Sequence, residues 1–303
     1  MATIAILGPG GVGGFLAAAL AHAGTDTLVV ARDETAELIE QDGILLESVR
    51  LGDFTAHPRS TAALDEPVDA LFVATKASGL ETALRRIATT PPLVIPLLNG
   101  LDHMVTLRAR FGWNTVVAGT IRIEADRPEP ARITQTSPFL RVDLASDDPA
   151  LVQRLEPIRE LLERAQVPAT VGASESQILW TKLVRLNALA CTTSASGREL
   201  GFIRSDPEWR SKLEGCINEA AAVANADGAT IDPANTIAEL EDAHAELGSS
   251  MQRDIAAGRA PELDAIAGSV LRAGKRVGVA CPTISELAAR IAEIAGVPAP
   301  RVD

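Results

Sequence analysis

A glycine-rich segment near the start of the chain has the residue types and spacing of a phosphate-binding loop. It follows a short apolar run, Thr3–Leu7, and leads into a helical pattern, Phe15–Ala23. Between a strand and a helix, such glycines allow a tight turn, a close approach of the backbone to a pyrophosphate, and close packing of helix on strand. The helix N-terminus adds unpaired N–H groups and the positive end of its dipole. The pattern predicts dinucleotide binding by Gly8, Pro9, Gly10, Gly11, Val12 and Gly13; a glycine-rich turn without a ligand is the alternative.

Arg32 follows the second predicted strand, where a dinucleotide site distinguishes NAD from NADP. A carboxylate at this position, about 20 residues past the glycines, usually accepts a hydrogen bond from the ribose 2′-hydroxyl of NAD. An arginine there suits the 2′-phosphate of NADP instead. Arg32 therefore favours NADP(H). The adjacent Asp33 leaves a second interpretation open, in which Arg32 is a solvated surface residue.

Two further polar residues follow predicted strands. Lys76 comes after Ala70–Ala74, and Asn99 comes shortly after Leu93–Leu97. Ligands of open α/β sheets bind outside the carboxyl ends of the strands, so both residues are candidates for the site. An ordinary solvated lysine and a plain Asn-Gly turn would explain the same residues.

Lys182 lies in a predicted helix that is otherwise rich in apolar residues. A lysine in such a helix either extends its ammonium group to water or is held in a polar cleft. In a cleft it could stabilise and protonate an oxygen on which negative charge develops. Position alone favours the extended, structural role.

Two kinds of element are predicted to position these residues. Helix-length segments between short apolar strands indicate βαβ units and a buried parallel sheet, with an antiparallel addition after Arg122. The predicted strands are Thr3–Leu7, Thr27–Ala31, Ala70–Ala74, Leu93–Leu97, Val116–Gly119, Arg132–Thr136, Leu140–Ala145 and Thr170–Gly172. The predicted helices after the first are Pro149–Arg164, Glu175–Ala190, Pro207–Ala226, Pro233–Leu247, Glu262–Arg276 and Ile284–Ile294. The expected fold is α/β: an N-terminal Rossmann-like, doubly wound parallel sheet, residues 1–170, followed by an all-helical C-terminal domain, residues 171–303.

Composition excludes several classes of protein. The 303 residues are 47% hydrophobic and carry a net charge of −12, which fits a folded protein and argues against nucleic-acid binding. Three scattered cysteines indicate a reducing, cytoplasmic compartment with buried thiols, and four isolated histidines predict no metal site. No apolar run is long enough to span a membrane. The apolar C-terminal helices are compatible with a homodimer interface or with a core alone.

The segments above, together with others downstream, resemble the ketopantoate reductase (2-dehydropantoate 2-reductase) family. The matching stretches are Gly8–Gly14 with Arg32, Thr75-Lys76, Leu98-Asn99-Gly100, Trp180-x-Lys182-Leu183, Gly197-Arg198-x-Leu200-Gly201, and Ser249-Ser250-Met251 through Asp254-Ile255 to Glu262-Leu263-Asp264.

The resemblance implies that NADPH reduces a 2-oxo acid in a cleft between the two domains, converting 2-dehydropantoate to pantoate in pantothenate biosynthesis. Lys182 matches the general acid, and Ser250 matches a serine that binds the substrate carboxylate. Glu262 matches a catalytic glutamate beside the cofactor and the lysine. Asn99 matches a position near cofactor and substrate, as does Lys76 beside the cofactor. Ala125 matches a backbone contact to the nicotinamide.

Two departures from the family concern the substrate. The better-known members carry asparagines four and eight residues after the lysine, where this chain has Leu186 and Ala190. Asn187 is rotated about 140° from the lysine around the helix and cannot simply substitute. Two alternatives therefore stay open: a reductase of a less polar 2-oxo acid or ketone, and a non-catalytic protein that senses NADP(H).

Overall fold

The computed structural model describes residues 2–302, which form two compact units. The α/β unit contains the chain up to Leu98 and His103–Ile178, and the helical unit contains Asn99–Asp102 and the chain from Leu179 onward. The sequence analysis placed a single boundary between residues 170 and 171. The contacts divide the chain later, within a helix, and they give the helical unit four residues from the first half of the sequence.

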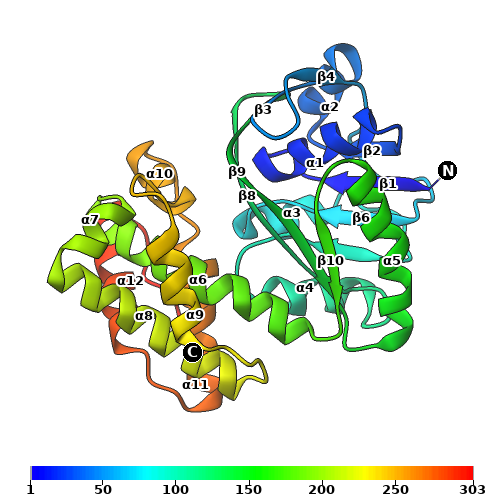
Figure 1. Ribbon diagram of the computed structural model, residues 1–303. Coiled ribbons are helices and arrows are strands. Elements are labelled where there is room, and N and C mark those ends of the chain that lie inside the picture. The colour runs from blue at the N-terminus through cyan, green and yellow to red at the C-terminus, as the bar shows by residue number, and fades with distance from the viewer. Residues whose placement is uncertain (1, 303) are drawn as a thin grey trace. The chain divides into compact units, whose positions relative to one another are not determined.

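A parallel sheet in the order β5-β2-β1-β6-β7 forms the centre of the α/β unit (Figure 1). The chain moves in one direction across the sheet from β1 to β2 and β5, and in the other direction from β6 to β7. The switch point of this doubly wound sheet therefore lies between β1 and β6. The expected Rossmann-like fold is therefore confirmed. The strands are β1 (Thr3–Leu7), β2 (Asp26–Val30), β5 (Arg59–Thr61), β6 (Ala70–Val73) and β7 (Val94–Pro96).

A second sheet, in the order β10-β9-β3-β4, has β8 as an additional partner of β9. Its strands are β3 (Ile44–Ser48), β4 (Phe54–Ala56), β8 (Ala118–Glu129), β9 (Arg132–Ala145) and β10 (Ala169–Gly172). The long antiparallel pairing of β8 with β9 confirms the expected addition, and β10 is the expected edge strand.

Two strand predictions for this sheet were wrong in detail. Val116–Gly119 was expected as a fifth parallel strand, but only Val116 makes a parallel bridge, to Val94, and β8 runs antiparallel to β9. The two strands expected at Arg132–Thr136 and Leu140–Ala145 are one continuous strand. Gln135 and Ser137 in its middle are buried, whereas Thr136, Pro138 and Phe139 are exposed. The buried Gln135 side chain, 1% exposed, accepts a hydrogen bond from Ser48 Oγ at 2.7 Å.

Helix α1 (Gly11–His22) lies between the two sheets, in contact with β1 and β2 on one side and with β3, β8 and β9 on the other (Figure 1). Residues 13–20 of this helix are small or apolar, and all of them are buried, so the helix can pack against both sheets. The remaining helices of the α/β unit are α2 (Asp33–Asp42), the 3₁₀ turn η1 (Ala77–Gly79), α3 (Leu80–Leu84), α4 (His103–Phe111) and α5 (Pro149–Arg164).

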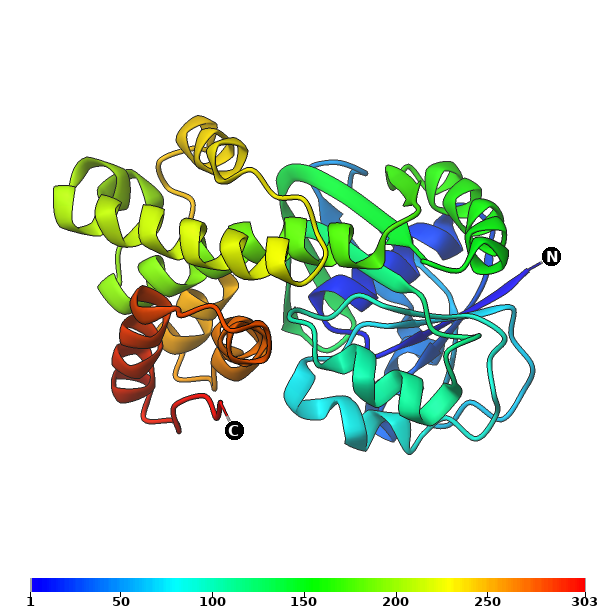
Figure 2. The same cartoon turned by 90° about the horizontal axis from the view of Figure 1, so that it is seen from below.

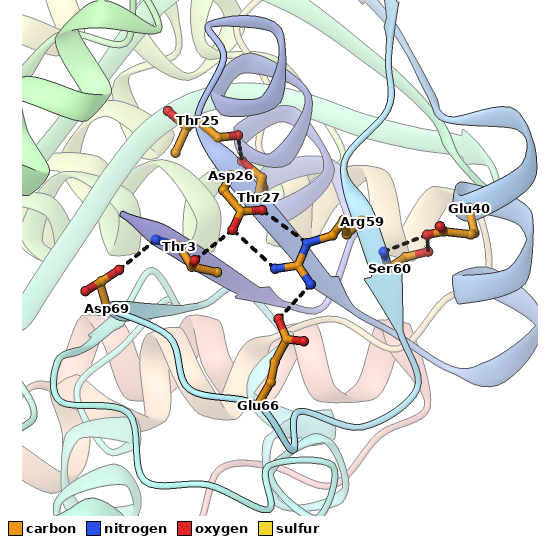
Figure 3. Close-up of polar contacts among 9 residues, drawn as sticks. All are labelled: Thr3, Thr25, Asp26, Thr27, Glu40, Arg59, Ser60, Glu66 and Asp69. Atoms are coloured by element: carbon orange, nitrogen blue, oxygen red, sulfur yellow. Dashed lines mark hydrogen bonds and ion pairs between the residues drawn. The ribbon is translucent and has the colours of Figure 1, made fainter. Parts of the chain in front are cut away.

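A polar network joins the amino ends of β1, β2 and β5, as Figure 3 shows. Asp26 accepts hydrogen bonds from Thr3 Oγ1 at 2.7 Å and from Arg59 Nε at 3.1 Å. Arg59 also pairs with Glu66 at 2.7 Å. The Arg59 guanidinium and the Thr3 hydroxyl hold the pKa of Asp26 below its usual 3.8. This edge is opposite the carboxyl ends of the strands, so the network serves stability rather than ligand binding.

We expect Arg59→Met to destabilise the protein by at most about 1 kcal/mol near neutral pH, because both partners remain partly exposed and screened by water. A depressed folded-state pKa of Asp26 contributes stability above pH 3.8 that is lost as the pH falls through the folded-state value. Thermal unfolding followed against pH should therefore show the variant and the unmodified protein converging in acid. Asp26→Asn should give the same loss near neutral pH, and a difference that does not depend on pH would contradict this explanation.

The helical unit contains helices only, within the part of the chain that the structure describes. Its elements are α6 (Glu175–Ser196, which begins in the α/β unit), α7 (Leu200–Ser205), α8 (Pro207–Ala226), α9 (Pro233–Asp242), α10 (Ser250–Ala256), the π-helical turn η2 (Asp264–Gly268), α11 (Ser269–Val277) and α12 (Pro282–Ala295). Helix α8 packs against α7, α9, α11 and the red α12 (Figure 2). The all-helical prediction is confirmed, and α8 has the predicted bounds.

The start of α8 illustrates why these helices form where they do. Asp206 caps the helix by accepting hydrogen bonds from the N–H groups of Glu208 and Trp209, and Pro207 occupies the first helical position. Helix α9 begins with the same Asp-Pro pair, Asp232 and Pro233, but it ends at Asp242 instead of the predicted Leu247. None of the helices within residues 2–302 combines the length and apolar character that crossing a membrane requires.

Candidate active site

The predicted phosphate-binding loop joins β1 to α1. Gly8 has a φ of +91°, a conformation that favours glycine, and its N–H donates to the carbonyl oxygen of Val30 at 3.0 Å. A Cβ atom at Gly13 would collide with the carbonyl oxygen of Gly8, so only glycine permits this close packing of helix on loop. Both glycines therefore have the structural roles that the sequence predicts.

The N-terminus of α1 fits a pyrophosphate group. Gly10 caps the helix without any side-chain hydrogen bond, and the first turn carries no acidic residue. A Cβ atom at Gly10 would meet nothing within 4 Å, so the backbone faces open space. Gly11, by contrast, lies directly against the carbonyl oxygen of Ala125. The register of β8 against β9 shifts just before Ala125, as in the β-bulges that often adjoin functional sites.

Arg32 and Lys76 are exposed at the carboxyl ends of β2 and β6 respectively. Each precedes a helical turn as its N-cap residue, Arg32 for α2 and Lys76 for η1. Asp33, the residue that blurred the prediction for Arg32, lies 3.5 Å from Arg86 Nη1. Asp33, the acidic neighbour of Arg32, is therefore paired with Arg86.

Four predicted residues lie in the helical unit: Asn99, Lys182, Ser250 and Glu262. The structure brings two of them into contact, because Asn99 Nδ2 donates to Glu262 Oε2 at 3.0 Å. Both side chains are half-buried. Glu262 directly precedes Leu263 and the turn η2, and π-helical turns are frequent at functional sites.

Lys182 is half-buried on α6, two residues after a tryptophan that anchors the helix. Trp180 is 1% exposed, and its Nε1 donates to Asp227 Oδ2 at 3.0 Å. Asp227 Oδ1 accepts from Arg276 at 2.8 Å. The sequence analysis did not identify Asp227, although a buried indole N–H requires an acceptor somewhere in the fold.

Ser250 is the exposed first residue of α10, and Ser249 before it is buried. Ser249 Oγ accepts from the N–H of Gln252 at 3.1 Å, which caps the helix, and lies 2.9 Å from Thr193 Oγ1 on α6. The adjacent serines thus have different environments: Ser249 is buried and caps α10, and Ser250 is exposed. Thr193, which no sequence pattern indicates, connects α6 to the start of α10 through Ser249.

The two positions at which this chain departs from the family have different environments. Leu186 is half-buried at the edge of the helical core, whereas Ala190 is 0% exposed within it. Asn187 is also completely buried, and its Oδ1 accepts a weak hydrogen bond from Cys191 Sγ at 3.5 Å. The Asn187 side chain therefore lies inside the helical unit beside Cys191, one turn further along α6.

All three cysteines are buried, and burial disfavours the thiolate form that acts as a nucleophile. Burial raises the pKa of the Cys191 thiol to about 12 and that of Cys281 to about 11. Burial likewise raises the pKa of Cys216. All three are free thiols packed in the helical unit. Among residues 2–302, no group of three or more side chains could hold a metal ion.

Comparison with known proteins connects both units to one family. The family model described as ketopantoate reductase PanE/ApbA matches residues 4–145, and the model of its C-terminal domain matches residues 176–301. The chain is 30% identical over 294 residues to the 2-dehydropantoate 2-reductase of Mycobacterium tuberculosis, covering 93% of this chain and 94% of that protein.

Solved structures agree with these sequence matches. A 2-dehydropantoate 2-reductase from Geobacter metallireducens superposes with a TM-score of 0.88 at 27% identity, covering 96% of this chain and 99% of that one. D-mandelate dehydrogenase, solved with NADH and anilino(oxo)acetate, has the same fold, with a TM-score of 0.87 at 19% identity, covering 98% of this chain and 100% of that one. The family models span most of both units, and the chain belongs to the ketopantoate reductase family of nicotinamide-dependent oxidoreductases.

Proposed function

We propose that this protein uses NADPH to reduce a 2-oxo acid to the 2-hydroxy acid, and that 2-dehydropantoate is its substrate. The observation that carries the proposal is the set of polar side chains in the helical unit of a chain from this family: Lys182, Ser250, and Asn99 bonded to Glu262. A protein that only senses NADP(H) would have no use for an acid at the hydride acceptor, and an enzyme family fits this set better.

Each residue has a chemical task in this proposal. In the α/β unit, Gly8–Gly13 would hold the dinucleotide and Arg32 would bind its 2′-phosphate; the nicotinamide, when bound, would supply the hydride. Negative charge then develops on the substrate oxygen, where the Lys182 ammonium stabilises it and donates a proton. The Ser250 hydroxyl donates to the substrate carboxylate. Glu262 and Asn99 orient one another through their hydrogen bond, in the roles that the family resemblance implies for them.

Leu186 favours a second candidate, a reductase of a less polar 2-oxo acid or ketone. An asparagine at this position in the better-known family members would give the substrate hydroxyl a partner. A buried hydroxyl without a partner loses about 1–3 kcal/mol. That loss corresponds to about 5- to 150-fold in affinity.

The test is NADPH oxidation by the unmodified protein with a panel of 2-oxo acids that includes 2-dehydropantoate and 2-oxoisovalerate. We expect Leu186→Asn to raise kcat/KM for 2-dehydropantoate about 5- to 150-fold relative to 2-oxoisovalerate, because the amide supplies the missing partner. Position 190 is better left unchanged, since an asparagine there would enter the fully buried core.

Leu186→Ala is the matched control, because it removes the apolar side chain without adding an amide. It should leave the ratio of the two kcat/KM values close to that of the unmodified protein. A preference of several hundredfold for 2-dehydropantoate in the unmodified protein would mean that other side chains bind the hydroxyl. No turnover with any 2-oxo acid would refute the proposed function itself.

A further inference from the structure

The loop that carries Asn99 is bound to helix α11 by a dense set of hydrogen bonds within the helical unit. Leu101 N donates to Ser269 Oγ at 3.2 Å, and Ser269 Oγ donates to Asp102 Oδ2 at 2.8 Å. Ser269 is 1% exposed, so its hydroxyl is a fixed and specific contact. A Cβ atom at Gly100, whose φ is +83°, would collide with the carbonyl oxygen of Ala265 in η2. The loop backbone therefore rests directly on the π-helical turn.

Arg272 closes this arrangement from the outside of α11. Its Nη2 donates to Asp102 Oδ2 at 2.7 Å, and its Nη1 donates to Asp264 Oδ1 at 2.7 Å. Nη2 also donates to the carbonyl oxygen of Asp264 at 2.9 Å. The guanidinium thus joins the loop to the first residue of η2, two residues after Glu262. The Arg272 side chain is 23% exposed, whereas the side chains of Asp102 and Asp264 are 54% and 67% exposed, so only the guanidinium end of these charge-assisted bonds is shielded from water.

Asn99 and Glu262, which are hydrogen-bonded to each other, flank the two segments that these contacts join. Asn99 begins the loop and Glu262 precedes the turn, and the loop and the turn are joined by Asp102, Ser269 and Arg272. An amide on a free loop would sample many orientations, and a hydrogen bond at 3.0 Å requires one of them. A salt bridge at the far end of the loop restricts that sampling without touching either side chain.

We propose that Arg272 is a positioning residue that acts through Asp102 to hold Asn99 in its hydrogen bond with Glu262. The inference rests on the roles of Asn99 and Glu262 in the proposed function. Arg272 is not among the residues that the family resemblance indicates. It lies on α11, far from the glycine loop in sequence. The proposal also predicts that substituting Arg272 changes cofactor binding and turnover only while Asn99 is present.

The experiment is a double-mutant cycle of Arg272→Met and Asn99→Ala, measured both as the dissociation constant of NADPH and as kcat/KM for the best 2-oxo acid. We expect Arg272→Met alone to lower kcat/KM about 10-fold, because small displacements of a positioned group can reduce rates up to about 100-fold. In the Asn99→Ala background the same substitution should change neither quantity by more than about twofold, because interacting sites are not additive.

Lys212→Met is the matched control. It removes a 2.7 Å ion pair with Glu286 that joins α8 to α12 in the same unit and involves no predicted site residue. It should leave both quantities unchanged. Asp102→Asn, which keeps the shape of the side chain, replaces Arg272→Met in the cycle if that variant does not fold.

If the fold-changes in kcat/KM of the two single variants multiply in the double variant, the proposal is overturned. Arg272 would then contribute to general stability and not act through Asn99. An Asn99→Ala variant that matches the unmodified protein in both measurements would overturn it as well. If the unmodified protein turns over no 2-oxo acid, the proposed function fails, but the cycle in the NADPH dissociation constant still decides whether Arg272 acts through Asn99.

Discussion

Replacing Lys182 by methionine should lower kcat by about 100- to 10,000-fold, the range typical of general acid–base catalysis. Methionine keeps an unbranched, apolar side chain of similar length and removes the ammonium group. Because the lysine is assigned to the helical unit, and the glycine loop to the α/β unit, NADPH affinity should stay close to that of the unmodified protein. The measurements are steady-state kinetics with a 2-oxo acid and NADPH binding by fluorescence titration.

Lys212→Met is a suitable control for this prediction too, since it removes a partly buried lysine from α8, another helix of the same unit. It should retain full turnover. A Lys182→Met variant that keeps most of its kcat would show that the lysine only extends its charge to water. Loss of folding, detected by circular dichroism, would also assign it a structural role.

Arg32→Ala should weaken NADPH binding by about 10- to 150-fold and leave NADH binding nearly unchanged, since hydrogen bonds to charged groups contribute about 1.5–3 kcal/mol. The reason is positional: Arg32 is exposed at the carboxyl end of β2, and only NADPH carries the 2′-phosphate. Dissociation constants for both cofactors give the comparison directly.

Arg59→Ala is the control, because it removes another exposed guanidinium from the α/β unit, but at the amino ends of the strands. Neither dissociation constant should respond to it. Equal losses of NADPH and NADH binding in Arg32→Ala would assign Arg32 to general electrostatics and remove the basis for a preference for NADP.

The elements that the sequence predicted best are those whose signals are local. β1 has the predicted bounds because five consecutive apolar or β-branched residues run into a glycine turn. α5 and α8 begin as predicted because each opens with an Asp-Pro pair, in which aspartate caps the helix and proline occupies its first position. Such signals depend only on neighbours in the chain.

The elements that the sequence did not predict depend on distant strand partners or on hydrogen bonds from side chains to the backbone. β5 is only three residues, Arg59–Thr61, and pairs with β2 without an apolar pattern of its own. α6 continues past the predicted Ala190 to Ser196, and in this extension the buried hydroxyls of Thr192 and Thr193 are satisfied by carbonyl oxygens one turn earlier, at 2.7 Å each. Threonines in such a run do not indicate a helix until those bonds are known.

The candidate site shows the same division. The glycine loop follows from local spacing, and the roles of Lys182, Ser250 and Glu262 came from resemblance to a family. The contact of Asn99 with Glu262 joins residues 163 positions apart, and no local pattern indicates it. Its dependence on Asp102 and Arg272 became visible only with the fold.

The order in which the chain is synthesised gives the loop at Asn99–Asp102 a further significance. These four residues leave the ribosome with the strands and helices of the α/β unit, which can fold first, as N-terminal domains generally do. Their partners Glu262, Ser269 and Arg272 are synthesised more than 160 residues later. The helical unit therefore completes these hydrogen bonds only after Arg272 has been synthesised, and a fragment that begins at Leu179 would expose Ser269 and Arg272 without the segment that covers them.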